Sequence, residues 1–169
     1  MKKILITLAT LLALAAPASA TAQFPEVIKI GAKEEALTVE PLDTYFSNPD
    51  NFKILKKYIP DGSCTALWRG YIGYWEIKNS KLLLNKIEAG SCSEESRKIL
   101  PLDQIFPGKS QPVFAEWYSG NLVMPRGKLI EYIHLGYASR YEKYLIMEIK
   151  KGFVVKQYTI KGKNKPPSL

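Results

Sequence analysis

One segment of the sequence, residues 132–142, gathers polar side chains of the kind that acid–base chemistry uses. It contains His134, the single histidine of the chain. Imidazole titrates near neutral pH, and a carboxylate can fix which of its ring nitrogens carries the proton. His134 is therefore a candidate general acid or base, with Glu142 or Glu116 as its orienting partner. The competing interpretation is a buried histidine that is bonded to a backbone carbonyl.

Signature motifs of the large enzyme classes are absent from the sequence. There is no G-x-S-x-G, no H-E-x-x-H, no phosphate-binding P-loop and no glycine fingerprint for a dinucleotide. We therefore expect no cofactor and no metal. The sequence favours a non-enzymatic protein, with catalysis left open.

Aromatic side chains are the second group of candidate functional residues. Tyr and Trp can stack on a sugar ring or on a partner's side chain while their polar edges donate hydrogen bonds. A neighbouring arginine would offer donors to an anionic partner. The candidate binding residues are Tyr137, Arg140, Tyr141, Trp117 and Tyr118. Aromatics at alternating strand positions also fill β cores, so both interpretations stay open.

The first 20 residues have the pattern of a secretory signal peptide. Lys2 and Lys3 precede an apolar run over residues 4–16, and residues 18–20 read Ala-Ser-Ala. We predict cleavage near Ala20 and a periplasmic or secreted protein. The apolar run is too short to span a bilayer and no comparable run follows it, so no stable membrane insertion is expected.

The two cysteines, Cys64 and Cys92, both follow the predicted cleavage site. An oxidising compartment and an even number of cysteines predict a disulfide between them. A redox pair or a metal site is less well supported, because the cysteines are far apart in sequence and have only His134 to help them.

Net charge narrows the class of partner. The chain carries +8, and removal of the two signal-peptide lysines leaves +6. Export excludes nucleic acid, which leaves anionic lipid head groups, cell-wall polymers or an acidic protein. Part of the excess lies in residues 161–169, which we predict to be a flexible basic tail, so a solvated surface explains the charge equally well.

A single globular domain is predicted over residues 21–160. Residues 26–30 predict a first strand and residues 41–46 a helical turn. Asn48 suits an N-cap and Pro49 a first helical position, so they predict the one convincing α-helix, which ends near residues 60–62.

From Cys64 onward the pattern is that of strands. Turn signals separate apolar runs at 65–77, 82–87, 113–118, 121–124, 128–135, 141–149 and 153–160, with one more helical turn at 101–106. Tyr71 and Trp75 share a face that should lie in the core, and Gly70 and Gly73 indicate a bulge or a close backbone approach. We predict an α+β fold, mainly an antiparallel meander with one α-helix and short helical turns on its flank.

Two stretches carry a resemblance to a protein family. Residues 68–77 read WRGYIGYWEI, and residues 132–142 read YIHLGYASRYE. Together with residues 113–120, they are similar to segments of an uncharacterised bacterial family of exported proteins. The resemblance spans roughly residues 40–155 and implies a shared fold, and it carries no mechanism.

Three functional hypotheses follow. The first is a non-enzymatic binding or interaction protein, for example an inhibitor or an immunity-type protein that covers a partner's site with a rigid surface. The second is a small hydrolase or lyase that acts on cell-wall or glycan material through His134 and Glu142. The third is a carrier of a hydrophobic ligand.

Overall fold

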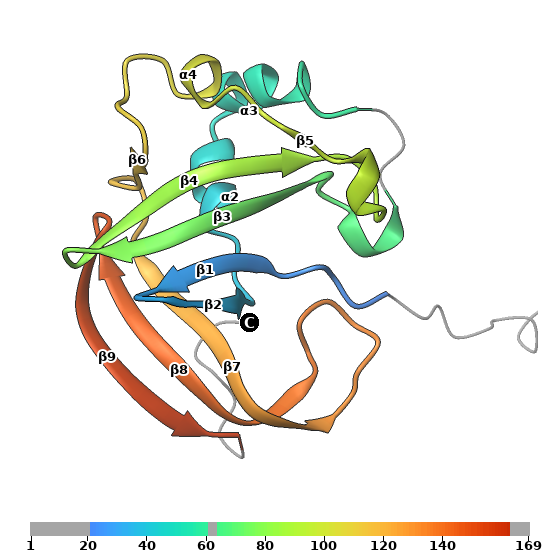
Figure 1. Cartoon of the computed structure of the whole chain (residues 1–169), viewed down its shortest axis with the longest axis vertical. Coiled ribbons are helices and arrows are strands. Elements are labelled where there is room, and N and C mark those ends of the chain that lie inside the picture. The colour runs from blue at the N-terminus through green and yellow to red at the C-terminus, as the bar shows by residue number, and fades with distance from the viewer. Residues whose placement is uncertain (1–20, 61–63, 163–169) are drawn as a thin grey trace, which may run out of the picture.

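The computed structural model describes residues 21–60 and 64–162, which form one curved β-sheet with short helices along one side (Figure 1). The strands are β1 (Glu26–Ile30), β2 (Lys33–Leu37), β3 (Tyr71–Lys78), β4 (Lys81–Ala89), β5 (Lys98–Ile99), β6 (Val113–Phe114), β7 (Gly120–Glu131), β8 (Arg140–Lys150) and β9 (Phe153–Lys161). The helices are α2 (Pro41–Phe46), α3 (Pro49–Lys56) and α4 (Leu102–Ile105), and the 3₁₀ turns are η1 (Thr65–Leu67) and η2 (Glu94–Ser96). This confirms a β-rich α+β class. The predicted signal peptide and most of the predicted tail lie outside the described residues.

The sheet is mixed, so the predicted uninterrupted antiparallel meander is not confirmed. Its strand order is β2-β1-β3-β4-β9-β8-β7, with β5 and β6 pairing beside β4. The hairpins β3–β4, β7–β8 and β8–β9 are antiparallel as expected. However, β1 runs parallel to β3, and β9 returns to pair with β4 at Lys81 and Phe153. Both pairings join segments that are distant in sequence.

The two end strands of the sheet, β2 and β7, approach each other. Just after β2, the backbone N–H and the hydroxyl of Thr38 both donate to the carbonyl of Val123, at 3.0 and 3.1 Å. Arg126 of β7 donates two hydrogen bonds to the Glu35 carboxylate of β2, at 2.7 and 2.5 Å. A planar bidentate pair fixes register as well as charge. The sheet therefore rolls up until its ends are in contact.

Local sequence explains several element boundaries. Asn79 and Ser80, both at positive φ, make the two-residue turn between β3 and β4, as the right-handed twist of a hairpin requires. The Asn48 side chain accepts a hydrogen bond from the Asp50 N–H at 2.9 Å, and Pro49 is the first residue of α3. The predicted cap is confirmed, although α3 ends earlier than predicted, at Lys56.

Four predicted strands have other limits in the structure. Residues 65–67 are the 3₁₀ turn η1, so the strand predicted from residue 65 begins at Tyr71. The strand predicted over 113–118 is only β6, because its chain turns away after Phe114. The two strands predicted over 121–135 are one strand, β7, in which Gly127 has a φ of 79° at an irregularity of the pairing with β8.

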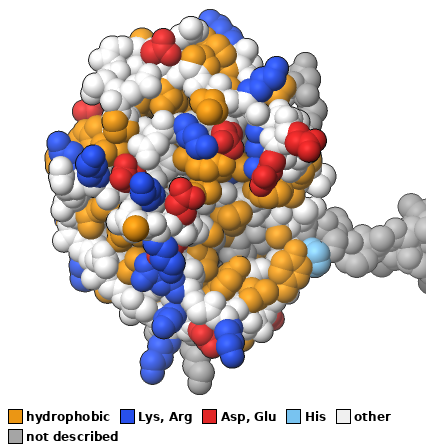
Figure 2. Space-filling view, viewed as in Figure 1, with side chains coloured by type: hydrophobic (Ala, Val, Ile, Leu, Met, Phe, Trp, Pro, Cys, Tyr) orange, Lys and Arg blue, Asp and Glu red, His pale blue; other side chains and the backbone are white. Residues whose placement is uncertain are grey.

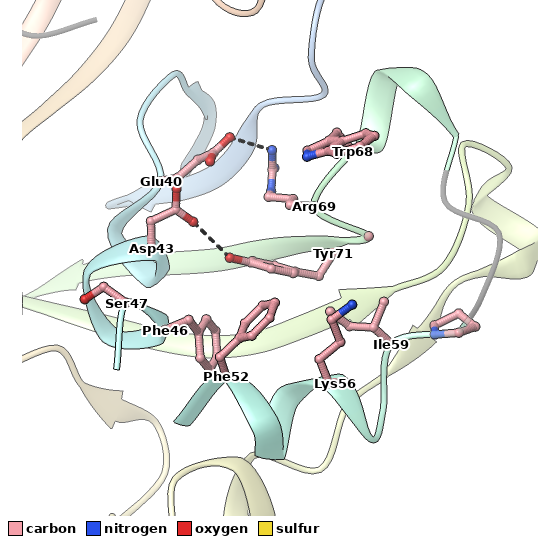
Figure 3. Close-up of a pocket in the computed structure, with 12 residues that line it drawn as sticks. Glu40, Asp43, Phe46, Ser47, Phe52, Lys56, Ile59, Trp68, Arg69 and Tyr71 are labelled. Carbon is pink, nitrogen blue, oxygen red and sulfur yellow. Dashed lines mark hydrogen bonds and ion pairs between the residues drawn. The ribbon is translucent and has the colours of Figure 1, made fainter. Parts of the chain in front are cut away.

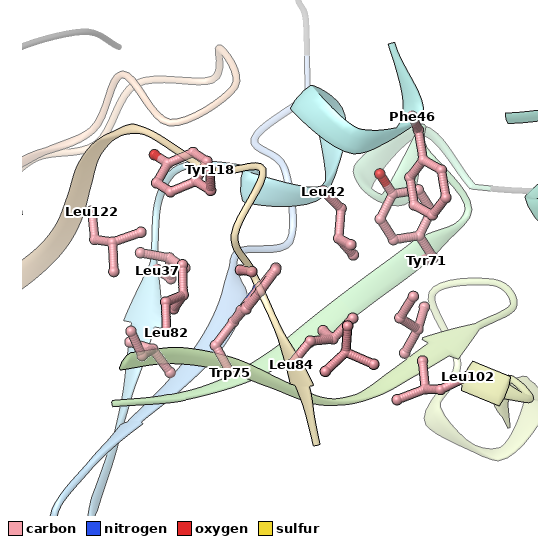
Figure 4. Packing of buried hydrophobic residues seen from close by; sticks show 14 of the residues in the cluster. Leu37, Leu42, Phe46, Tyr71, Trp75, Leu82, Leu84, Leu102, Tyr118 and Leu122 are labelled. Atoms are coloured by element: carbon pink, nitrogen blue, oxygen red, sulfur yellow. The ribbon is translucent and has the colours of Figure 1, made fainter. Parts of the chain in front are cut away.

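The core lies inside the rolled sheet, under α2 and α4 (Figure 4). Trp75 and Tyr71 are 1% and 3% exposed, and their strand β3 lies between β1 and β4, which confirms the predicted central strand. Gly73 is the predicted close approach: a Cβ there would lie 2.8 Å from a carboxylate oxygen of Glu26. The core also includes Leu37, Leu42, Phe46, Leu82, Leu84, Leu102, Tyr118 and Leu122.

Cys64 and Cys92 form the predicted disulfide, with their Cα atoms 5.7 Å apart. The bond joins the residue before η1 to the loop between β4 and β5. It therefore anchors the stretch of chain that leads into β3.

Candidate functional site

A pocket of about 730 Å³ opens between α2, α3 and the segment that leads from η1 into β3 (Figure 3). Glu40 and Asp43 form one side of it, and Lys56 of α3 lies on the opposite side. The ring of Tyr71 lies between these two sides, and Trp68 lies above it in this view. Ligand pockets commonly have volumes of roughly 300–1,000 Å³, so this one can hold a small molecule or a segment of a partner.

Trp68 is the most exposed large hydrophobic side chain of the described residues, at 80%. Its position is nevertheless fixed. The Gln23 side chain accepts a hydrogen bond from the Trp68 backbone N–H at 3.2 Å and donates to the Thr65 carbonyl at 2.8 Å. The disulfide at Cys64 anchors the same turn. An indole that is exposed on a well-held backbone is a feature of binding surfaces rather than of cores.

A second pocket, of about 500 Å³, lies on the other side of Trp68. It shares Glu40, Trp68 and Arg69 with the first pocket and is completed by residues of the N-terminal segment and by Gly136. Trp68 therefore stands between two hollows that have the same charged pair at their common wall.

Arg69 points into the protein and organises this wall. Its guanidinium donates to Glu40 Oε1 at 2.7 Å, to the Tyr137 hydroxyl at 2.9 Å and to the Phe24 carbonyl at 3.0 Å. Burial works against the Arg69 charge, but the surrounding acidic groups, Glu26 foremost, keep the pKa of Arg69 above its ordinary value.

Tyr137 closes the same network from the loop between β7 and β8. Its hydroxyl contacts Glu40 Oε1 at 2.8 Å and the Phe24 carbonyl at 3.0 Å. Burial raises the pKa of the Tyr137 hydroxyl, so it stays protonated and can donate its hydrogen to either of these oxygens. Three segments that are distant in sequence thus meet around one guanidinium.

Glu26 is a fully buried carboxyl beneath the wall. It accepts a hydrogen bond from the Trp75 indole N–H, and its other oxygen lies 4.0 Å from Arg69 Nε. Neither of these last two atoms has a hydrogen-bond partner among the described residues. Burial raises the pKa of Glu26 to about 8, because desolvation of the charged form outweighs the attraction of Arg69. Glu26 is therefore a neutral acid at pH 7.

Asp43 lies at the pocket rim on α2. It accepts a hydrogen bond from the Tyr71 hydroxyl at 3.2 Å. Desolvation and then a hydrogen bond and charge repulsion from Glu40 raise the pKa of Asp43 to about 6. The Asp43 carboxyl therefore keeps its proton to a higher pH than an ordinary aspartate does, because it is partly buried beside Glu40.

The structure does not bring His134, Glu142 and Glu116 together. His134 is exposed on the 132–139 loop, where its ring packs edge-on against Tyr132. Glu142 accepts a hydrogen bond from the Lys128 N–H at 2.9 Å, and Glu116 pairs with Lys109. No hydrogen bond or ion pair of the described residues joins any two of the three groups.

The predicted binding residues have different positions. Tyr137 belongs to the network behind Trp68, as described above. Arg140 is exposed and pairs with Glu131 at 2.8 Å, outside both pockets. Tyr141 is half-buried, with its ring against that of Tyr144. The last two predicted residues, Trp117 and Tyr118, are away from the pockets.

Trp117 and Tyr118 have structural contacts. The Trp117 ring stacks on Phe106 with centroids 5.5 Å apart, and its indole N–H donates to the Pro41 carbonyl at 3.1 Å. Tyr118 is 8% exposed and donates to the Asn121 carbonyl at 2.9 Å. Their contacts are those of core aromatics, the alternative that the sequence left open.

Sequence reasoning missed Glu26, Glu40, Asp43 and Arg69 as a group. A usable signal was present in β1, where Glu26 of the run EVIKI lies on the same strand face as the buried Ile28. A second signal was the adjacent pair Trp68-Arg69, of which the structure exposes the indole and buries the guanidinium.

The described residues contain no group of three or more His, Cys, Asp and Glu side chains arranged to hold a metal ion. Within 21–60 and 64–162, no helix has the length and apolar character needed to cross a membrane. Comparison with protein-family models, with curated proteins and with solved structures gives no match for this chain. The resemblance given by residues 68–77 and 132–142 stays a prediction.

Proposed function

We propose that the protein is an exported, non-enzymatic binding protein whose ligand is held in the pocket beside Trp68. The observation that carries this proposal is the 80% exposure of Trp68 on a backbone fixed by Gln23 and by the disulfide. A rigid side chain loses little conformational freedom on binding, so contact with it is converted efficiently into affinity.

The charges around Trp68 indicate the chemical class of the ligand. Arg69 already lies over the Tyr71 ring at 5.7 Å, and Lys56 lies over the Phe52 ring at 5.5 Å. No cation of the described residues lies over Trp68, although the carboxyl groups of Asp43 and Glu40 line the same pocket. Indole faces bind cations well, and a carboxylate completes such a site. The ligand that fits is an amine or guanidinium on an apolar stem, as on a basic side chain of a partner.

The charged lining also separates the hypotheses. A hydrophobic carrier would place apolar ligand against Glu40, Asp43 and Lys56, which would desolvate charged groups without compensation. The pocket therefore supports a binding protein rather than a carrier.

Calorimetric titration with a short lysine-rich peptide tests the proposal, with the same peptide carrying Gln in place of Lys as the control ligand. The free polyamine spermidine distinguishes a small cation from a basic peptide. We expect binding of a cationic probe alone, weakened about tenfold by Trp68→Ala and by Asp43→Asn. The matched control is Ile99→Ala, which removes a 69% exposed side chain outside the pocket.

Two results would overturn this assignment. One is equal binding of the Lys and Gln peptides or of a neutral oligosaccharide. The other is unchanged affinity in both pocket variants when thermal unfolding shows that they are folded. Binding should also weaken below about pH 6, where Asp43 takes up its proton.

A second candidate function rests on the carboxyl groups of Glu40 and Asp43, which line the same pocket. Two carboxyl groups in one pocket, one with its pKa raised to about 6, resemble an acid–base pair. The test is an assay of cell-wall hydrolysis by the wild type, Asp43→Asn and the exposed-site control Glu94→Gln. Activity that is lost in Asp43→Asn and kept in Glu94→Gln would show that the protein is an enzyme.

A further inference from the structure

The tip of the β7–β8 hairpin exposes a set of large apolar side chains. Leu129 and Ile130 at the end of β7 are 48% and 55% exposed, and Tyr132 and Leu135 in the loop are 56% and 57% exposed. Figure 2 shows hydrophobic side chains gathered at the lower right, beside the histidine of the same loop. Single exposed apolar residues are ordinary, but four within one hairpin tip indicate a surface that something covers.

Several cations lie on the strands beside this tip. Lys143 on β8 lies directly opposite Lys161 on β9 in the strand register. Like charges at such a position repel unless an anion lies between or above them. Neither lysine, nor Lys128 on β7, forms an ion pair with another described residue.

The acids near the tip already have partners. Glu131 pairs with Arg140 at 2.8 Å, and Glu142 accepts from the Lys128 N–H. Both acids therefore have partners. They are outnumbered by four cations, which are Lys128, Arg140, Lys143 and Lys161. These strand segments beside the apolar side chains therefore carry a net positive charge.

The loop is held in shape before any partner arrives. The Gln23 N–H donates to the Gly136 carbonyl at 3.1 Å, and the Ile133 N–H donates to the Ser139 hydroxyl at 3.1 Å. Tyr137 ties the loop to Glu40 and Phe24, as described above. Because these bonds keep the loop folded, the apolar side chains stay exposed at little ordering cost on binding.

We propose that the 128–135 hairpin tip docks on the surface of an anionic lipid bilayer. Leucine and isoleucine would enter the boundary between head groups and acyl chains, and Tyr132 has the amphipathic ring that favours this depth. Lys128, Lys143 and Lys161 would lie over the acidic head groups. Such a bilayer offers acidic head groups to the lysines and an apolar interior to the aliphatic side chains. This proposal depends on residues outside the Trp68 pocket.

Vesicle co-sedimentation tests it with the chain from Thr21 onward, which contains all the core residues described above and lacks the apolar run of residues 4–16. We expect binding to mixed phosphatidylglycerol and phosphatidylcholine vesicles at low salt, and little binding to phosphatidylcholine alone. Leu135→Ser should weaken binding about tenfold. The matched control, Val155→Ser at a 51% exposed position of β9, should bind as the wild type does.

A second set of variants tests the contribution of charge to vesicle binding. Lys143→Gln with Lys161→Gln should weaken binding to the anionic vesicles and reduce its dependence on salt. Equal binding to both vesicle types, or no loss in Leu135→Ser, would refute the proposal. So would a dimer in solution that Leu135→Ser dissociates, because the tip would then cover a second copy of the chain.

Discussion

Glu26 should make the protein less stable as the pH rises. Its pKa is about 8 in the folded protein and 4.5 ordinarily, so between these values the folded state holds a proton that the unfolded state has released. The stabilisation that Glu26 contributes is therefore fully present below pH 4.5 and is lost as the pH rises from 4.5 to about 8. Above about pH 8 the stability levels off. The whole window corresponds to up to about 5 kcal/mol at 1.36 kcal/mol per unit.

The upper part of this window isolates Glu26. Asp43 acts in the same direction, because its pKa is raised from 3.8 to about 6. Its stabilisation is already almost entirely lost by about pH 6.5, so it changes little above that pH. Carboxyl groups with lowered pKa values, such as Glu35, change stability only at acid pH. Between pH 6.5 and 8 we therefore expect a loss of about 2 kcal/mol from Glu26 alone.

Urea unfolding at several pH values measures this loss. Glu26→Gln keeps a neutral group of the same shape beside Trp75 and Arg69, so its stability should be flat over the same range. The exposed-site variant Glu94→Gln should keep the wild-type slope. If the slopes of wild type and Glu26→Gln coincide, or if wild-type stability rises with pH, then Glu26 is ionised in the folded protein and the reasoning is wrong.

Three further predictions concern the framework. Cys64→Ser combined with Cys92→Ser should lower the free energy of unfolding by about 3–4 kcal/mol, measured by urea unfolding, since the bond spans a separation of 28 residues; equal stability of the reduced and oxidised wild type would contradict this. Trp75→Ala should cost about 3–5 kcal/mol and abolish cooperative unfolding in a thermal melt, because the ring is 1% exposed. Gly73→Ala should cost about 1–3 kcal/mol by the same measurement, because its Cβ would meet Glu26 and Trp75 within 3 Å, and a neutral result would show that the close approach is relaxed in solution.

Much of the local structure could be predicted because short-range rules decide it. The cap at Asn48, the turn after β3 and the burial of Tyr71 and Trp75 follow from neighbouring residues alone. The parallel pairing of β1 with β3 could not be predicted in this way, since it joins Val27 to Tyr74 and nothing in either segment specifies the other. Topology of this kind is set by the global packing of the core.

The candidate site was hidden for a related reason. Glutamate is rarely fully buried, so the place of Glu26 on the same strand face as Ile28 was only a weak signal of an interior carboxyl. Glu40 and Asp43 have no sequence signature, because their hydrogen-bond partners, Arg69 and Tyr71, lie about 30 residues away and the contacts arise only in the fold. The polar segment 132–142 contributed only Tyr137 to the network around Arg69. The other residues of the network come from distant parts of the sequence.

The adjacent residues Trp68 and Arg69 join the two parts of this site. Trp68 points outward between two hollows, while Arg69 points inward and is held by Glu40 and Tyr137. A movement of the Trp68 backbone would also move Arg69. The hydrogen bonds of the Arg69 guanidinium to Glu40 and Tyr137 oppose that movement. A ligand that contacts Trp68 meets a surface whose rigidity comes from the buried network beneath it. The acids around Arg69 thus have two roles at once, because Glu40 both holds the guanidinium and presents a carboxylate to the pocket.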